Sequence, residues 1–522
     1  MPSLQLPPRR LLAALLIALA AAAAIAGGLK LRRWAWDASE NAHFRADILN
    51  AHRWGRAANR IGYLNLYRNR VDRQRRKANL QLDYPPLRLL IMERWGGWTR
   101  ENFPKVRRWE PSYAFNKPLL RLNNAFELIA SAAVFFLVAL WTRRVIGDRA
   151  PPGGDRAPPS NRPWILGGLA ALLVWFNPAL IWVAHCWPQW DAWGAAVYLV
   201  AALFASLGLW LPVGLVIGVG ALLKGQVLIV AAFFVLWPLF TRNFGGAARV
   251  LLGLFLGLVL GGSPWFLGVF PKNRWVFHPP AALWVAGVIL GTAVLLFLWK
   301  RRNPAVRPAP WLAGATILAF VLCVPLFGSD LSWVKVGFLF GSGHFPVLRM
   351  GRTPNFPALL EIWVPALEGR ATPALRGILW MVYVSGLVVV ARWTARMAQS
   401  PHPRILAAFA APWLISVALL PQMHERYLIY GAVATAMAAV ALRGYILLHL
   451  TLTAIAVLAM VPIRLVPDLV RNGGDLHPVC MILVVAAAAA CFAAAAAPRG
   501  LSPAPPPARN PARTPGGDAP TA

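Results

Sequence analysis

Acidic residues are scarce in this sequence. Its 522 residues include only 19 Asp and Glu against 52 Lys and Arg, which gives a formal net charge of +33 at pH 7. Charged residues of both signs make up 14% of the chain, whereas a soluble protein carries about a quarter. Because 58% of the residues are hydrophobic, this shortage of charge excludes an ordinary soluble protein and indicates a polytopic membrane protein.

The excess of positive charge does not form one patch. Lys and Arg stand at the ends of apolar runs and in one long loop, which is the distribution that anionic lipid and membrane topology produce. We therefore expect membrane lipid, and no nucleic acid, as a partner.

Cysteine is also rare. The four residues Cys186, Cys323, Cys480 and Cys491 lie in or beside apolar runs, with no CxxC pair and no histidine pair at ligand spacing. The sequence predicts buried thiols, and neither a disulfide framework nor a zinc site.

Long apolar runs fill most of the chain. Each approaches the length that crosses a hydrocarbon core of about 30 Å. The runs lie at 11–29, 125–142, 164–184, 192–209, 211–223, 226–240, 248–268, 281–298, 311–327, 375–392, 405–421, 427–442, 446–466 and 477–497. The first contains a signal-like "AAAAIAGG", but its length favours a retained helix. We predict an all-α polytopic membrane protein with about 12 to 14 transmembrane helices.

Basic residues then predict the topology. Alternating segments place most of the arginine clusters on one face, which the positive-inside rule identifies as the cytoplasm, together with both termini. The exception is the basic loop 30–122, but long loops cross membranes largely regardless of charge. Residues 1–497 form one predicted domain with outer loops 30–122 and 328–374, and the Pro-rich tail 498–522 is predicted to be disordered and cytoplasmic.

Polar motifs gather on the opposite, outer face. In the first outer loop, the spacing of Ile48, Leu49, Trp54 and Ala58 is typical of an amphipathic helix at the interface. This helix contains Asp47, whose carboxylate is suited to accept a proton from a sugar hydroxyl. The alternative is an ordinary N-terminal helix charge or a solvated side chain.

The stretch "DYPPL" begins at Asp83. Proline disfavours helix in the preceding residue, so Asp83 is predicted to cap a helix that starts near Pro85 and Pro86. The same rigid corner is suited to hold the Asp83 carboxylate and the Tyr84 phenol at a substrate site. Both interpretations are compatible.

The turn "HCWPQWDAW" separates two apolar runs. We expect its tryptophans Trp187, Trp190 and Trp193 to be interfacial belt residues. Gln189 and Asp191 are different, because an acid at a membrane boundary usually has a partner or a function.

Cations recur on the same face at Lys224, in "LKGQ", and at Arg426, in "MHERY". Such cations can extend to the interface without further function. Opposite the outer acids, they are suited to bind the phosphate of a lipid, Arg426 through two hydrogen bonds and Lys224 as a point charge.

The order of these motifs along the chain resembles that in the GT-C superfamily of polyprenyl-phosphate-sugar-dependent glycosyltransferases. The resemblance is strongest to the branch that contains the dolichyl-phosphate-glucose-dependent glucosyltransferases and their bacterial relatives. Five motifs carry the resemblance: Asp47 seven residues before Trp54, DYPPL at Asp83 to Leu87, Gln189-Trp190-Asp191, Lys224 with Gln226, and His424-Glu425-Arg426-Tyr427. Arg88 and Pro188 depart from the family pattern, so the acceptor is not carried over.

The resemblance implies inverting transfer of a sugar, hexosyl or mannosyl, from a polyprenyl phosphate to a hydroxyl of a glycan, lipid or protein acceptor. It assigns Asp47 as the base and Lys224, Arg426 and His424 to the donor phosphate. The residues that would shape the site or touch sugar are Asp83, Tyr84, Gln189, Asp191, Gln226 and Glu425. It implies no obligatory cofactor or metal, and a bacterial inner membrane with the site facing the periplasm.

Two other functions remain open. A lipid-linked saccharide flippase or transporter would place charged groups on discontinuous helices, as the short runs around Lys224 suggest. An oligosaccharide polymerase or ligase would act on diphosphate donors at the same face.

Overall fold

The protein is an all-α polytopic membrane protein. The computed structural model describes residues 8–39, 45–62, 65–67, 82–148, 161–266, 279–302, 312, 314–315, 319, 332–339, 347–367, 372–472 and 475–496. The tail 498–522, most of the spacer 145–163 and most of the apolar run 311–327 lie outside these residues.

The first half of the chain contains α1 (Pro8–Ala38), α2 (Arg45–Ile61), α4 (Pro86–Asn102), α5 (Tyr113–Asp148), α6 (Arg162–Trp175), α7 (Pro178–Ile181), the π-helical turn η2 (Trp182–Cys186), α8 (Asp191–Ser206), α9 (Trp210–Leu223), the 3₁₀ turn η3 (Gly225–Val230), α10 (Ala231–Phe240) and α11 (Phe244–Phe266).

The second half contains α12 (Pro279–Arg302), α14 (Ser332–Val334), η4 (Lys335–Leu339), α16 (Phe356–Trp363), η5 (Pro365–Leu367), α17 (Pro373–Gln399), α18 (Ile405–Ala408), α19 (Ala411–Leu419), η6 (Glu425–Tyr427), α20 (Leu428–Ala441), α21 (Tyr445–Met460), η7 (Ile463–Leu465), η8 (Asp468–Val470), the short antiparallel strands β1 (Arg471–Asn472) and β2 (Asp475–Leu476), and α22 (Pro478–Ala496).

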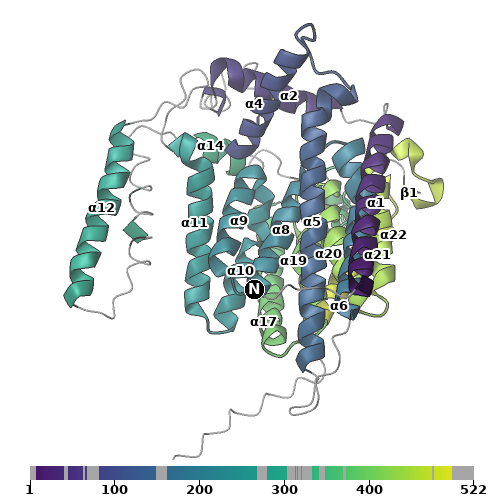
Figure 1. The fold of residues 1–522 in the computed structure, drawn as a ribbon. Helices are drawn as coiled ribbons and strands as arrows, with labels where there is room; N and C mark the ends of the chain where they lie inside the picture. The colour runs from purple at the N-terminus through teal and green to yellow at the C-terminus, as the bar shows by residue number, and fades with distance from the viewer. Residues whose placement is uncertain are drawn as a thin grey trace, which may run out of the picture.

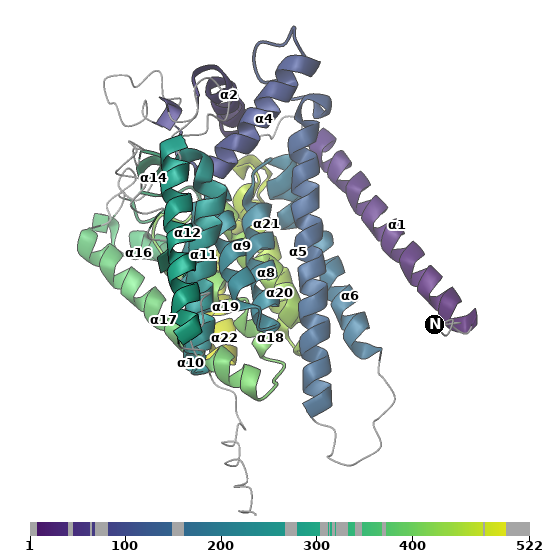
Figure 2. The ribbon, with the colours of Figure 1, turned by 60° about the vertical axis from the view of Figure 1, so that its left-hand side comes forward.

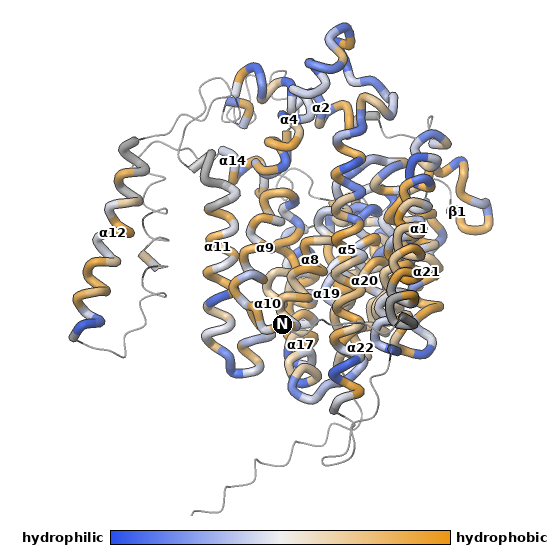
Figure 3. Tube along the Cα trace, viewed as in Figure 1, coloured by the Kyte–Doolittle hydropathy of each residue, from blue (hydrophilic) through white to orange (hydrophobic). Residues whose placement is uncertain are grey.

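Apolar helices run side by side in a bundle (Figures 1 and 2). Among the described residues, five are long and apolar enough to cross a membrane: Leu15–Ala38, Tyr113–Gly147, Arg162–Cys186, Pro373–Gln399 and Pro478–Ala496. Figure 3 shows hydrophobic residues along the bundle and hydrophilic ones concentrated at its ends. Six shorter apolar helices accompany the five spans. Membrane segments are thus confirmed, while the count of 12 to 14 stays a prediction.

Two helices of the first outer loop lie across one end of the bundle (Figure 1). In α2, Ile48, Trp54 and Ala58 are buried at helical spacing together with Ala51, which confirms the predicted amphipathic helix. The predicted member Leu49 is only partly buried. It packs closely on α4, because a Cβ added at Gly55 would lie 1.9 Å from the backbone oxygen of Met92.

The start of α4 is confirmed at Pro86, but the predicted cap is wrong. The N-cap is Pro85, in an extended conformation, and no side chain makes a capping hydrogen bond. Two consecutive prolines move the cap position two residues beyond Asp83. Pro86 then supplies the helical φ of the first turn.

The pair of short runs around Lys224 forms a broken helix. Helix α9 ends at Leu223, Lys224 has an extended backbone with φ −152° and ψ 109°, and a 3₁₀ turn leads into α10. Helix α9 packs backbone to backbone on α11, where a Cβ at Gly214 would lie 1.9 Å from the oxygen of Val250. This contact holds the end of α9 and therefore the position of Lys224.

Candidate functional site

Asp47 and Arg426 meet at the end of the bundle where α2 lies. The Nη1 atom of Arg426 is 3.3 Å from Oδ2 of Asp47, and Nε2 of Gln189 donates a hydrogen bond of 2.9 Å to the same oxygen. The predicted co-location of these acids and cations is confirmed. Asp47 stands in the first turn of α2, as the alternative reading also expected, but its side chain is 37% exposed and has specific partners.

Asp191 contacts two cations, Lys224 and Arg426. Its Oδ1 accepts hydrogen bonds from Nζ of Lys224 and, at 3.1 Å, from the hydroxyl of Tyr430. Its Oδ2 is 3.5 Å from Nε of Arg426. Arg426 thus bridges the partly exposed Asp47 and the fully buried Asp191. The predicted contact of Asp191 with sugar stays a prediction, because its visible partners are protein cations and a phenol.

The break in the helix after α9 places Lys224 in contact with this cluster. The side chain is buried, and its Nζ lies 4.9 Å from the centre of the Tyr427 ring. Nε2 of Gln226 donates a 3.0 Å hydrogen bond to the Tyr427 hydroxyl. Both motif residues of the hairpin therefore contact the segment that follows His424.

The loop between α19 and α20 is fixed by the second outer loop. The backbone nitrogen of Gln422 donates to the oxygen of Leu348 at 2.9 Å, and the hydroxyl of Thr353 donates to the oxygen of Met423 at 2.6 Å. These contacts place His424-Glu425-Arg426 at the site, although the loop itself is not helical until η6 begins.

His424 packs within the same cluster. Its burial, together with the nearby charge of Arg426, lowers the pKa of His424 below its usual value. Its Nδ1 lies 2.9 Å from Oε2 of Glu425, and its ring is 5.6 Å from that of Trp187. Glu425 packs against Gly351, where φ is +59° and a Cβ would lie 2.1 Å from Oε2. Glu425 therefore contacts His424.

Tyr84 of the DYPPL stretch packs against α2. The Tyr84 ring is 5.3 Å from the ring of Trp54, and its backbone oxygen accepts a 2.8 Å hydrogen bond from Tyr67. Burial raises the pKa of the Tyr84 phenol above its usual value, and the charges of Asp83 and Asp47 act in the same direction. DYPPL thus stands near Asp47 in space.

Arg88 was not among the predicted site residues. Its guanidinium carbon lies 3.2 Å from the ring centre of Tyr84 and 3.7 Å from that of Trp190. The side chain is 1% exposed, and none of its three nitrogens makes a hydrogen bond within the described chain. Burial lowers the pKa of Arg88 to about 10, so it stays charged at neutral pH. Its place directly after DYPPL was the available sequence signal.

A second buried ionic group supports the turn before α8. Arg32 of α1 donates through Nε to Glu127 of α5, and Nε2 of His185 lies 3.2 Å from the other carboxylate oxygen. Asn123 then donates to the backbone oxygen of Gln189 at 3.2 Å. Sequence reasoning missed this group, although Glu127, an acid inside the apolar run 125–142, was a signal for it.

The predicted interfacial role of the tryptophans is wrong. Trp187, Trp190 and Trp193 are at most 2% exposed. Trp193 donates from Nε1 to Oδ1 of Asn123 at 2.9 Å. The turn folds inward between α5 and α20, so its rings line protein instead of the lipid interface.

Within the described ranges, no group of three or more His, Cys, Asp or Glu side chains is arranged to hold a metal ion. A comparison of the sequence with known protein families finds no matching family, and a comparison with curated proteins finds no match either.

Proposed function

We propose that the protein transfers a sugar from a polyprenyl-phosphate donor to an acceptor hydroxyl at Asp47, with inversion at the anomeric carbon. The observation that supports this most directly is the pairing of a partly exposed carboxylate, Asp47, with Arg426, beside the buried cations Lys224 and Arg88. The GT-C-like order of the five motifs supports the same reaction.

Asp47 acts as the general base. The acceptor oxygen attacks the anomeric carbon as its proton passes to the carboxylate. The bond from that carbon to the phosphate oxygen breaks, and its electron pair leaves with the polyprenyl phosphate. Because the leaving group is already an anion, it needs cations more than a general acid.

The ion pair of Asp47 with Arg426 gives this reaction an order. While Nη1 of Arg426 lies against Oδ2, that oxygen is engaged twice, by Arg426 and by Gln189. A donor phosphate that binds Arg426 frees Oδ2 to accept the proton. Donor binding therefore precedes activation of the acceptor.

Other side chains position these groups. Asp191 holds Lys224 and Arg426 close together, and Gln189 orients Asp47. Arg88 is a third cation for the phosphate, because its unpaired guanidinium lies against Tyr84 in the same cluster. His424 completes the donor site, and Gln226, Asp83 and Glu425 shape it.

The site faces the exterior of a bacterial inner membrane, with both termini cytoplasmic. The placement of α2 and α4 at one end of the bundle (Figure 2) supports an outer catalytic loop. The arginine-rich ends of the apolar runs support the cytoplasmic assignment of the opposite end.

The test is turnover by the purified protein with a polyprenyl-phosphate sugar and an acceptor. Asp47→Asn keeps the size and the hydrogen bond from Gln189, so it should unfold like the parent protein but turn over about 100-fold more slowly or worse. Near-normal turnover would remove Asp47 as the base.

One observation favours a second function, transport of a lipid-linked saccharide. The helix broken at Lys224, with its buried charge, resembles the discontinuous helices of transporters. Vesicles that move labelled lipid between leaflets, without sugar transfer, would support transport over transfer. Turnover with a diphosphate donor alone would instead indicate a polymerase or ligase.

A further inference from the structure

We propose a second anion site, on the face of α2 that turns away from Asp47, which binds a diphosphate or a similarly multivalent phosphate ester. A cavity of about 500 Å³ lies between α2, α4 and the segment that follows α4. Six arginines line this arginine pocket: Arg53, Arg56, Arg60, Arg100, Arg107 and Arg108.

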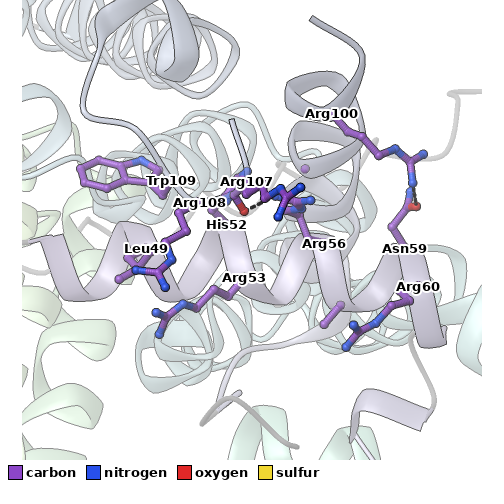
Figure 4. Close-up of a pocket in the computed structure, with 12 residues that line it drawn as sticks. Leu49, His52, Arg53, Arg56, Asn59, Arg60, Arg100, Arg107, Arg108 and Trp109 are labelled. Carbon is purple, nitrogen blue, oxygen red and sulfur yellow. Dashed lines mark hydrogen bonds between the residues drawn. The ribbon is translucent and has the colours of Figure 1, made fainter. Parts of the chain in front are cut away.

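Helical spacing separates the pocket from the reaction site. Arg53, Arg56 and Arg60 recur every three or four residues of α2 (Figure 4) and so share one face. Asp47 lies nine residues before Arg56, which places it about half a turn away, on the face of α2 that carries the buried Ala51 and Ala58. The two anion sites are therefore distinct.

The pocket concentrates positive charge without a compensating carboxylate. Its lining contains no Asp or Glu, and no described carboxylate forms an ion pair with any of the six arginines. Arg56 donates to the backbone oxygen of Arg107 at 2.6 Å, and Arg100 donates to Asn59 at 2.9 Å (Figure 4). The nearby Glu93 is engaged with Asn59 at 2.7 Å.

The chemistry favours a ligand with more than one phosphate. Guanidinium groups bind phosphate oxygens in pairs, so six of them exceed what a single phosphate can use. The volume lies in the usual range for small-molecule sites. Trp109 in the wall adds an aromatic face beside the charges. The assignment does not depend on which reaction takes place at Asp47.

Calorimetry with the full chain in detergent tests the site, with inorganic pyrophosphate and inorganic phosphate as probes. Pyrophosphate should bind at least about tenfold more tightly than phosphate. The triple variant Arg53→Gln, Arg60→Gln and Arg108→Gln removes three side chains that make no hydrogen bond to another residue that the structure describes, and should weaken pyrophosphate binding at least about tenfold.

A matched control separates the pocket from the overall charge. Arg121→Gln, Arg249→Gln and Arg392→Gln remove the same charge from exposed positions elsewhere and should leave the affinity unchanged. If both triple variants bind pyrophosphate alike, the proposal fails. Because Asp47→Asn should retain full pyrophosphate binding, failure of the catalytic proposal is distinguishable from failure of this one.

Two competitors then identify where the phosphate comes from. Geranyl diphosphate offers a lipid-linked diphosphate, and dihexanoylphosphatidylglycerol offers the headgroup of a bulk membrane lipid. Displacement of pyrophosphate by geranyl diphosphate supports the proposal and identifies a lipid-linked diphosphate as the class. Displacement by the phospholipid alone would overturn the preference for a diphosphate.

Discussion

The guanidinium of Arg426 lies 3.3 Å from the carboxylate of Asp47, across 379 residues of sequence. This contact joins the first outer loop to the loop before α20. It also places the carboxylate that we propose as the base beside the guanidinium that we propose to bind the donor phosphate.

Replacing Arg426 tests the bridge between the two carboxylates. Arg426→Lys keeps the charge but loses the fork that reaches both Asp47 and Asp191, so we expect a loss in kcat/KM for the lipid-phosphate donor of about tenfold or more. Arg443→Lys, at an exposed position, serves as the control. Equal kinetics for both variants would contradict a phosphate-binding role for Arg426.

Replacing Arg88 should affect the free energy of unfolding and the donor affinity in different ways. Because its guanidinium is buried without hydrogen bonds, Arg88→Met should leave the free energy of unfolding unchanged or raise it, as replacement of buried charge by apolar groups often does. Donor affinity should fall at least about tenfold if Arg88 binds phosphate. Unfolding in detergent and donor titration measure the two effects. Lost stability with unchanged donor affinity would assign Arg88 a purely structural role.

Lys224 and Asp191 form a buried pair whose rupture should be costly. Lys224→Met leaves a buried carboxylate with one cation fewer, and we expect the free energy of unfolding to fall by about 3 kcal/mol. Asp191→Asn in the same chain should restore part of this loss, and a double-mutant cycle measures the coupling. Additive effects of the two substitutions would show that the pair is not coupled.

The buried ring of His52 should make the free energy of unfolding depend on pH, through the packing of α2 on α4. Its ring is buried between Trp95 and Phe115, with Nε2 2.9 Å from the Thr99 hydroxyl. Burial, assisted by Arg56, lowers the pKa of His52 to about 4, so the unfolded chain takes up the proton first. The free energy of unfolding should therefore be complete above pH about 6.5 and fall by up to about 3 kcal/mol as the pH drops to about 4.

The measurement is denaturant unfolding of the protein from about pH 7.5 to about pH 4.5, which spans most of the shift in the pKa. His52→Gln removes the titrating ring while keeping a polar group near Thr99, and should flatten the slope. Parallel pH profiles for the two proteins would rule His52 out as the source.

Local sequence was sufficient for the elements of this fold. The apolar runs locate α8, α9, α11, α20 and α22 within a few residues, because a membrane-spanning helix satisfies its own backbone hydrogen bonds and shows itself as an apolar run of sufficient length. The run 375–392 ends seven residues before α17 does. The spacing of Ile48, Leu49, Trp54 and Ala58 likewise located α2, although Leu49 is only partly buried. The same information placed the motif residues at the ends of helices, where Asp47 and Lys224 are found.

Tertiary packing decided which of those ends meet. No local spacing relates Asp191 to Lys224 or to Tyr430, nor tells that Arg88 lies between two aromatic rings without a hydrogen-bond partner. The inward fold of Trp190 also depended on neighbouring helices closing over the turn. Periodicity describes the environment of one segment at a time, whereas ion pairs across hundreds of residues arise only when the helices have packed.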